Sequence, residues 1–148
     1  MQPQNPEYQQ FVKAIFSEAA FVNELGLRLK DVGPGWCETE LHVRPTHMQQ
    51  NNLIHARVQA TMADHTGGAA AGSLVGINES VLTVEFNINL LRAAQGDQLF
   101  CRAEVIKPEH SFSVSQADVY ALQGTESKHV ARAKITLAVV EGPMQEQQ

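Results

Sequence analysis

One stretch of the chain, Asn51–Gly72, combines helix-forming residues with a run of small and apolar ones. It starts with two asparagines, whose side chains favour turns and helix caps, and it contains no proline. The pattern predicts a helix from about Ala56 to Gly72, which would be ~26 Å long. Asp64 is its one acidic residue. We therefore interpret this segment as the central helix of the fold and Asp64 as the candidate functional residue.

Glycine makes the second half of this helix weak, at a cost of roughly 1 kcal/mol against alanine for each one. Four residues share one face at helical spacing: Ala60, Asp64, Gly67 and Ala71. A curved sheet wrapped closely around this face would stabilise the helix, so we expect added bulk at Gly67 or Gly68 to be destabilising. A carboxylate in such surroundings must be paired or have a shifted pKa. An average helical aspartate faces water, but these small and apolar neighbours favour a functional role for Asp64.

Alternation of apolar and polar residues from Val81 to Leu91 predicts a half-buried strand in which Thr83 shares the polar face with Glu85. Five further strands are predicted from short apolar runs separated by turn residues: 25–32, 36–43, 99–106, 112–121 and 129–140. The turn Gly33-Pro34-Gly35 joins the first two into a hairpin. Short connections predict that the last four strands form an antiparallel meander.

An apolar stripe before the hairpin predicts one amphipathic helix over about 6–25. Helix, hairpin, long helix and four strands together indicate an α+β protein, with an antiparallel sheet of five to six strands wrapped around the central helix. A chain of 148 residues fits one domain. We expect its core at about 16–140 and a frayed tail at 141–148.

Charge and cysteine usage narrow the functional classes. The net charge of −5 argues against a nucleic-acid surface, which usually concentrates lysine and arginine. No apolar run approaches the ~20 residues that span a bilayer, and the polar N-terminus does not resemble a signal peptide. Cys37 and Cys101 stand alone on separate predicted strands, which favours reduced thiols. We expect a soluble, cytoplasmic protein.

The six histidines raise the question of a metal site beside Asp64. His55 and Asp64 lie nine positions apart, on opposite sides of a helix, and the helix offers no i, i+4 pair of ligands. The pattern therefore argues against a metal. His65 is expected to pack against the sheet or to border the site. The others are expected in loops or on strand surfaces: His42, His47, His110 and His129.

The order of elements and two motifs resemble the hotdog fold, and more closely its acyl-CoA thioesterases of the phenylacetate-pathway and 4-hydroxybenzoyl-CoA types. Here His55-Ala56 is a variant of the family's His-Gly-Gly or His-Ala-Gly, and Ala63-Asp64 stands at the offset of its catalytic Asp or Glu. The segment Thr83–Ala94 is similar to the family's strand and exit turn. The resemblance implies an enzyme that hydrolyses a fatty or aromatic acyl-CoA to the free acid and CoA, without a cofactor.

The resemblance also implies roles for individual residues. Asp64 would act as general base or as nucleophile. The backbone N–H of Ala56, in a turn shaped by His55, would donate to the oxyanion. Thr83 stands where relatives orient the water, and Gln49 where they position the substrate. Because Asp64 lies more than two turns beyond Ala56, the resemblance implies a site built across a homodimer, alone or paired into a tetramer, with no nucleic-acid or membrane partner.

Two residues depart from the family pattern. Asn52 replaces the usual glycine before the histidine, and asparagine tolerates left-handed backbone better than most residues. Arg57 replaces the second glycine, so its bulk would narrow the path to the oxyanion site unless its guanidinium reaches a phosphate or carboxylate of the ligand. Arg92, at the strand exit, is another candidate for a CoA phosphate. Arg57 keeps a non-catalytic acyl-CoA-binding protein open as the alternative.

Overall fold

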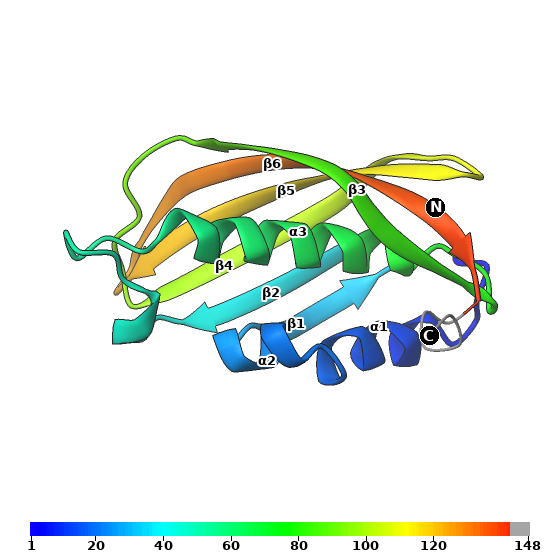
Figure 1. The fold of residues 1–148 in the computed structure, drawn as a ribbon, viewed down its shortest axis with the longest axis horizontal. Coiled ribbons are helices and arrows are strands. Elements are labelled where there is room, and N and C mark those ends of the chain that lie inside the picture. The colour runs from blue at the N-terminus through cyan, green and yellow to red at the C-terminus, as the bar shows by residue number, and fades with distance from the viewer. Residues whose placement is uncertain (143–148) are drawn as a thin grey trace.

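The computed structural model describes residues 1–142, and its elements follow the predicted order (Figure 1). Two helices, α1 (Tyr8–Ser17) and α2 (Ala20–Leu25), precede the hairpin of β1 (Arg28–Gly33) and β2 (Trp36–His42). A 3-10 turn, η1 (Pro45–His47), leads to the long helix α3 (Ala56–Gly72). Four strands follow: β3 (Glu79–Leu90), β4 (Gln98–Pro108), β5 (Phe112–Gln123) and β6 (Glu126–Glu141). Of the predicted frayed tail at 141–148, residues 143–148 lie outside the described residues.

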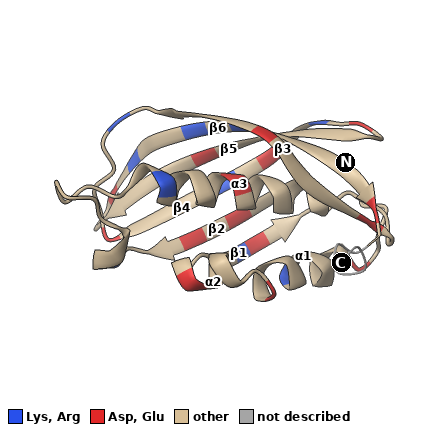
Figure 2. Ribbon diagram, viewed as in Figure 1, with Lys and Arg blue, Asp and Glu red and all other residues tan. Residues whose placement is uncertain are grey.

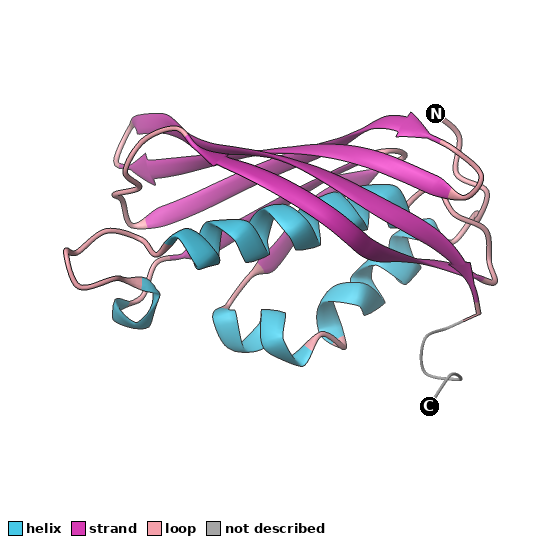
Figure 3. Ribbon diagram, turned by 45° about the horizontal axis from the view of Figure 1, so that its top comes forward, coloured by secondary structure: helices cyan, strands magenta, loops and turns pink. Residues whose placement is uncertain are grey.

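The strands form one antiparallel sheet of six, in the spatial order β1-β2-β4-β5-β6-β3. The sheet curves around α3, which lies between the sheet and the two N-terminal helices (Figures 1 and 3). This arrangement confirms the predicted hotdog fold, with the larger of the two expected strand numbers.

The predicted meander is wrong for β3, which pairs with β6 at one edge of the sheet, while β4 pairs with β2. The connection over residues 91–97 crosses the ends of the strands in between. Leu91 N–H donates to the carbonyl of Val130 at 2.8 Å, and Asp97 N–H donates to that of Leu122 at 3.1 Å. Because β2 and β3 are separated by other strands in the curved sheet, they contact α3 from opposite sides. Two adjacent strands of a hairpin would contact the same side of the helix.

Two neighbouring glycines of α3 have different surroundings. A Cβ atom on Gly67 would lie 2.7 Å from Cδ1 of Ile135, a fully buried side chain of β6. A Cβ atom on Gly68 would lie 3.6 Å from its nearest neighbour, Cδ2 of Leu137, which is an ordinary contact. The surroundings of Gly67 therefore support the expected exclusion of bulk, whereas Gly68 borders a cavity with room for a side chain.

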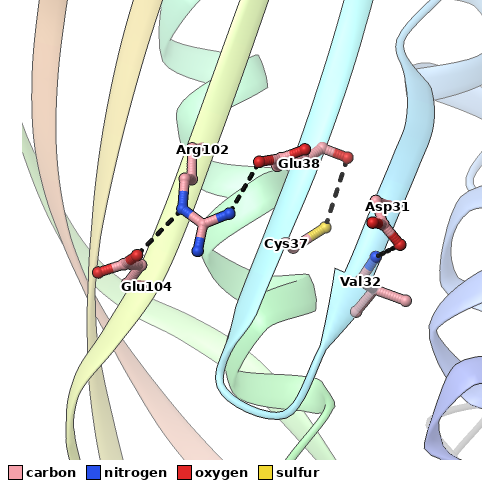
Figure 4. Close-up of polar contacts among 6 residues, drawn as sticks. All are labelled: Asp31, Val32, Cys37, Glu38, Arg102 and Glu104. Carbon is pink, nitrogen blue, oxygen red and sulfur yellow. Dashed lines mark hydrogen bonds and ion pairs between the residues drawn. The ribbon is translucent and has the colours of Figure 1, made fainter.

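The two faces of the sheet differ in chemistry. On the outer face, Arg102 of β4 lies between Glu38 of β2 and Glu104, with N–O distances of 2.7 and 3.0 Å (Figure 4). Acidic and basic residues are scattered over the rest of the ribbon (Figure 2). Inside the sheet, Cys37 and Cys101 are free and fully buried. Burial raises the pKa of both thiols, so neither is prepared to act as a nucleophile.

The predicted single helix over 6–25 is wrong, because the chain breaks between α1 and α2. Ala19 has extended backbone (φ −83°, ψ 92°). The carbonyl of Ser17 accepts a hydrogen bond from Nδ2 of Asn23 at 2.9 Å instead of one from the next helical turn. Asparagine side chains compete for backbone groups in this way, and apolar periodicity alone does not reveal it. Because α2 continues to Leu25, β1 begins later than predicted, at Arg28.

A β-bulge in β3 changes which of its residues face the helix. The pairing with β6 shifts between Thr83 and Glu85, so the intervening Val84 is the extra residue. Thr83 lies opposite Leu137, whose side chain is buried in the core. Side chains opposite one another across an antiparallel pair share a face, so Thr83 faces α3. Strict alternation had placed it on the other face, and that prediction is wrong.

His47 lies in the loop before α3, as predicted, but its side chain is buried, with a relative exposure of 2%. Its Nδ1 accepts the N–H of Arg44 at 2.9 Å, and its Nε2 lies 2.7 Å from the carbonyl of Leu25, at the end of α2. The acceptor role of Nδ1 assigns the proton to Nε2, which donates to Leu25. The carbonyl of His47 accepts the N–H of His55 at 2.9 Å. His47 therefore ties the end of α2 to the start of α3.

Candidate active site

The structure brings Asp64 and Thr83 together. Asp64 lies in the middle of α3 and is half-buried. The hydroxyl of Thr83 donates to Oδ1 of Asp64 at 2.7 Å. This contact depends on the bulge at Val84, which turns Thr83 toward the helix. One carboxylate oxygen is thus held in place, while the second makes no such bond to a side chain within residues 1–142.

Electrostatics favour a carboxylate that is more basic than an ordinary aspartate. Burial raises the pKa of Asp64, and the hydrogen bond from Thr83 lowers it in part, so the pKa stays above its usual value. None of the ion pairs formed within residues 1–142 includes Asp64. A carboxylate that is desolvated and lacks a cationic partner accepts a proton more readily, as a general base requires.

The start of α3 exposes a backbone donor. His55 is the N-cap residue, and its Nδ1 accepts the N–H of Arg57 at 3.0 Å. The carbonyl of His55 accepts the N–H of Val58, also at 3.0 Å. Within the described residues, the N–H of Ala56 makes no hydrogen bond. A free N–H at a helix start, backed by the helix dipole, can stabilise developing negative charge.

This donor and the carboxylate do not meet within one chain. Asp64 follows Ala56 by eight residues along the same helix. At the helical rise, the two positions are about 12 Å apart. A single thioester carbonyl cannot contact both groups of one protomer.

A cavity of about 690 Å³ opens beside Asp64. Its walls come from α1, α3 and the start of β3, with Leu137 of β6 between them. Most of the lining is apolar, and Asp64 with Thr83 forms a polar part of the wall. A concave apolar pocket with a few convergent polar groups is the usual form of a small-molecule site.

His65, the residue after Asp64, also lines this cavity. Its ring makes an edge-on contact with Phe16 of α1, with centroids 4.6 Å apart. Burial lowers the pKa of His65 to about 4, so the imidazole is neutral at pH 7. Its Nε2 is buried and makes no hydrogen bond within residues 1–142. Of the two expectations for His65, a place at the border of the site is confirmed, and its packing partner is α1.

The three predicted substrate-binding residues lie away from the cavity. Gln49 holds the loop before α3, since its Oε1 accepts the N–H of Asn51 and its own N–H donates to the carbonyl of Leu53 at 2.8 Å. Arg57, in the first turn of α3, and Arg92, in the 91–97 connection, are both exposed. They are free to meet a ligand outside the cavity.

The backbone at Asn52 confirms one expectation from the motif. Its φ is +60°, the left-handed value that glycine holds most easily and asparagine tolerates. Asn52 therefore occupies the turn that leads into His55 without a glycine.

The sequence pattern did not reveal the contribution of α1 to the site. Phe11, Ala14 and Ile15 line the cavity beside Asp64. Their helical spacing indicates that they share one apolar face of α1. The neighbouring sequence does not show which part of the protein that face covers. Within residues 1–142, no cluster of three or more His, Cys, Asp and Glu side chains is placed to hold a metal ion. No helix in that range is long and apolar enough to cross a membrane.

Comparisons with known proteins agree with this architecture. Residues 42–128 match the family model of the thioesterase superfamily. A crystal structure of a thioesterase family protein from Silicibacter pomeroyi has a TM-score of 0.89 at 34% identity, covering 91% of this chain and 99% of that one. A Haemophilus influenzae protein named "Putative esterase" is 25% identical over 119 residues, which is 80% of this chain and 84% of the relative. The crystal structure of a Haemophilus influenzae thioesterase shares the fold, with a TM-score of 0.79 at 23% identity over 88% of this chain and 90% of that one.

Proposed function

Because this chain belongs to the thioesterase superfamily, we propose that it hydrolyses the thioester of a fatty or aromatic acyl-CoA to the free acid and CoA. One observation carries the proposal. A half-buried carboxylate, Asp64, is held by Thr83 in the wall of an apolar cavity large enough for an acyl group. The free N–H of Ala56 supplies the second group that thioester hydrolysis needs.

In the general-base form of the mechanism, Asp64 takes a proton from water as the water oxygen attacks the thioester carbon. Thr83 orients the carboxylate through its 2.7 Å hydrogen bond. The carbonyl oxygen gains negative charge, which the N–H of Ala56 and the α3 dipole stabilise. The carbon–sulfur bond then breaks, and the proton on Asp64 passes to the departing CoA sulfur. His55 contributes as the cap that shapes this helix start.

The same geometry allows Asp64 to act as a nucleophile. Its unbonded oxygen would attack the thioester carbon and expel the CoA thiolate, leaving a mixed anhydride between the acyl group and Asp64. Water would then attack the anhydride and release the acid and the free carboxylate. Water labelled with ¹⁸O distinguishes the two routes, because in a single turnover only the nucleophilic route can leave the label in Asp64.

Both forms require the helix start of one protomer to face Asp64 of another, so we propose a homodimer. The β3 strand supports it, because β3 lies at the edge of the sheet and its outer side is unpaired in this chain. Large apolar side chains on it are exposed: Leu82, Val84, Phe86 and Leu90. An exposed, apolar edge strand is a ready site for pairing with another strand. Pairing of such dimers into tetramers is compatible with this arrangement.

The CoA portion would lie outside the cavity, near the start of α3. Arg57 and Arg92 are exposed cations that suit its phosphates, and the loop held by Gln49 borders the same helix start. We propose that the enzyme acts in the cytoplasm, where CoA esters meet reduced thiols such as Cys37 and Cys101.

Arg57 favours a second candidate function, a non-catalytic acyl-CoA-binding protein. It follows Ala56 directly, so its side chain can obstruct the approach of a carbonyl to the Ala56 N–H. The cavity would then hold an acyl group without turnover.

The decisive experiment measures thiol release from short-chain, long-chain and aromatic acyl-CoAs by wild type and Asp64→Asn. We expect wild type to hydrolyse at least one ester and Asp64→Asn to lose the activity. If both turn over equally, Asp64 has no part in the reaction. If neither releases thiol while CoA esters still raise the melting temperature, the binding function replaces the enzymatic one. Arg57→Gly then tests the obstruction, because it should restore turnover.

A further inference from the structure

We infer that the cavity between α1 and α3 is the acyl site, that Ala14 and Gly68 set its size, and that it selects uncharged hydrocarbon acyl groups larger than acetyl. The inference rests on the proposed function for the reaction, and it assigns the substrate class and the residues that determine it. Ala14 and Gly68 have no role in the chemistry described above.

The α1 wall is fixed against α3 beyond the cavity. A Cβ atom on Gly72 would lie 3.2 Å from Cδ1 of Ile15 and 3.5 Å from Cε1 of Phe11. The two helices therefore approach closely at Gly72, and Ile15 and Phe11 continue from this contact into the cavity lining. On the same side, the edge-on contact of Phe16 with His65 joins α1 to the residue next to Asp64. The wall is thus a packed surface whose position relative to Asp64 is defined.

Small side chains keep the cavity open on both helices. Ala14 lines it from α1, where its neighbours in the lining are larger. Gly68 lines it from α3, one turn after Asp64, with only an ordinary contact at 3.6 Å facing its missing side chain. A larger residue at either position would project into the cavity rather than into the core. These two positions therefore set the volume available to an acyl group.

The chemistry of the walls defines the acyl class. Neither lysine nor arginine occurs among the residues that line the cavity, and the two charged side chains there are the carboxylates of Glu18 and Asp64. An acyl group with its own carboxylate would be desolvated beside the carboxylate of Asp64, with no lysine or arginine in the cavity lining to pair with. Each methylene of a hydrocarbon acyl group, in contrast, gains favourable free energy when it is buried against these apolar walls. An acetyl group would leave most of the 690 Å³ without contacts.

The α1 wall lies outside the part of the chain that matches the family model. The match to the thioesterase superfamily covers residues 42–128, which include Asp64, Gly68 and Thr83. Ala14 lies outside this range. Acyl selection is therefore divided between a wall inside the matched region and a wall outside it.

The test compares wild type, Ala14→Phe and Lys13→Phe. Lys13 is exposed on α1, so Lys13→Phe adds the same side chain to the same helix without entering the cavity. The substrates are p-nitrophenyl octanoate and acetate, which need no CoA site. We expect the ratio of kcat/KM for octanoate over acetate to fall at least tenfold in Ala14→Phe and to stay within twofold in Lys13→Phe. For Ala14→Val, the ratio should lie between those of the other two variants. This smaller substitution provides a test if Ala14→Phe does not fold.

An unchanged ratio in Ala14→Phe, or an equal change in Lys13→Phe, would overturn the assignment. Faster hydrolysis of suberoyl-CoA than of octanoyl-CoA by wild type would overturn the uncharged class, since these esters have equal chain lengths. A readout without turnover is the rise in melting temperature with 1-octanol, expected in wild type and lost in Ala14→Phe. If 1-octanol gives this difference and no CoA ester is hydrolysed, the thioesterase proposal fails and the cavity assignment stands. No difference with 1-octanol would remove the assignment itself.

Discussion

Two opposing effects act on the carboxyl of Asp64. Burial in the wall of the cavity raises its pKa, and the hydrogen bond from Thr83 lowers it. Burial is the larger effect, so the group remains more basic than an exposed aspartate. The hydroxyl of Thr83 therefore has two consequences, because it orients one oxygen and limits the rise in pKa. Substitution of Thr83 removes both effects and leaves the carboxyl of Asp64 in place.

Thr83→Val removes the hydroxyl and keeps the branched shape. Without the hydrogen bond that favours the ionised form, the pKa of Asp64 should rise further. The acid limb of the pH profile of kcat/KM should therefore move to higher pH, and activity at neutral pH should fall by about tenfold. Thr83→Ser keeps the hydroxyl and is expected to retain the profile of wild type. An acid limb at the same pH in all three proteins would remove Thr83 from the site.

Asp64→Asn should stabilise the fold at neutral pH. A carboxyl whose pKa is raised on folding binds its proton more tightly in the folded state. The stability it contributes is present below the unfolded pKa and is lost as the pH rises through the folded pKa. Asparagine avoids that loss, so the melting temperature should exceed that of wild type at neutral pH, and the difference should narrow toward about pH 4.

Asp97→Asn, at an exposed carboxyl in the 91–97 connection, is the matched control for this comparison. It should show no comparable rise in melting temperature. A lower melting temperature for Asp64→Asn at neutral pH would mean that the carboxylate stabilises the fold, and would contradict the burial argument.

At the scale of elements, α3 is held by close approach to strands and not by its own propensity. Gly67 lies against Ile135, and the hydroxyl of Ser115 donates to the carbonyl of Gly67 at 3.0 Å. Gly68, one residue on, borders the cavity. Two adjacent glycines with the same helix propensity thus have different structural roles. A leucine substitution at each position is expected to have different effects on stability.

Gly67→Leu should lower the free energy of unfolding by ~1–3 kcal/mol or more, because its side chain would overlap the buried Ile135. Gly68→Leu should leave the melting temperature near that of wild type, because its side chain can extend into the cavity and leucine has the higher helix propensity. Thermal and urea unfolding of both variants measure the difference. Equal losses of stability would show that the cavity does not accommodate the added side chain.

At the scale of the whole molecule, the proposed mechanism needs a second copy of the chain to complete the site. The positions of Ala56 and Asp64 are about 12 Å apart along the axis of one helix. The β3 strand leaves one edge of the sheet open and carries exposed apolar side chains next to Thr83. A second copy paired along β3 would cover this surface and bring a second helix start to the site. Assembly and activity should therefore be lost together.

Val84→Glu tests this coupling. Val84 is 56% exposed in the chain, so glutamate should be tolerated by the isolated fold, but at a dimer interface it would bury an unpaired charge. We expect a dissociation constant at least tenfold higher by analytical ultracentrifugation, with thioesterase activity falling as the protein becomes monomeric. Ile77→Glu, at a residue 71% exposed and outside β3, is the control and should remain dimeric. A dimeric Val84→Glu protein would exclude β3 as the interface.

The sequence by itself determined the features that arise from local patterns. Periodicity, capping and composition, which depend on neighbours in the chain, predicted the helix over 56–72, most strand positions and Asp64 as the candidate residue. The left-handed turn at Asn52 followed from the family motif. The resemblance to hotdog thioesterases in the His55 motif also rests on local spacing. These predictions needed no knowledge of which distant segments meet.

Tertiary structure alone decided how those parts form a site. The bulge that turns Thr83 toward Asp64 lies in the pairing of β3 with β6. This pairing is possible because the 91–97 connection carries the chain away from β3 to β4, which lies beside β2. The break between α1 and α2 and the space beside Gly68 likewise depend on long-range contacts. Local patterns record which face of an element is apolar, but the contact that covers that face depends on the packing of the whole chain. The cavity beside Asp64 is therefore a property of the fold and not of any one motif.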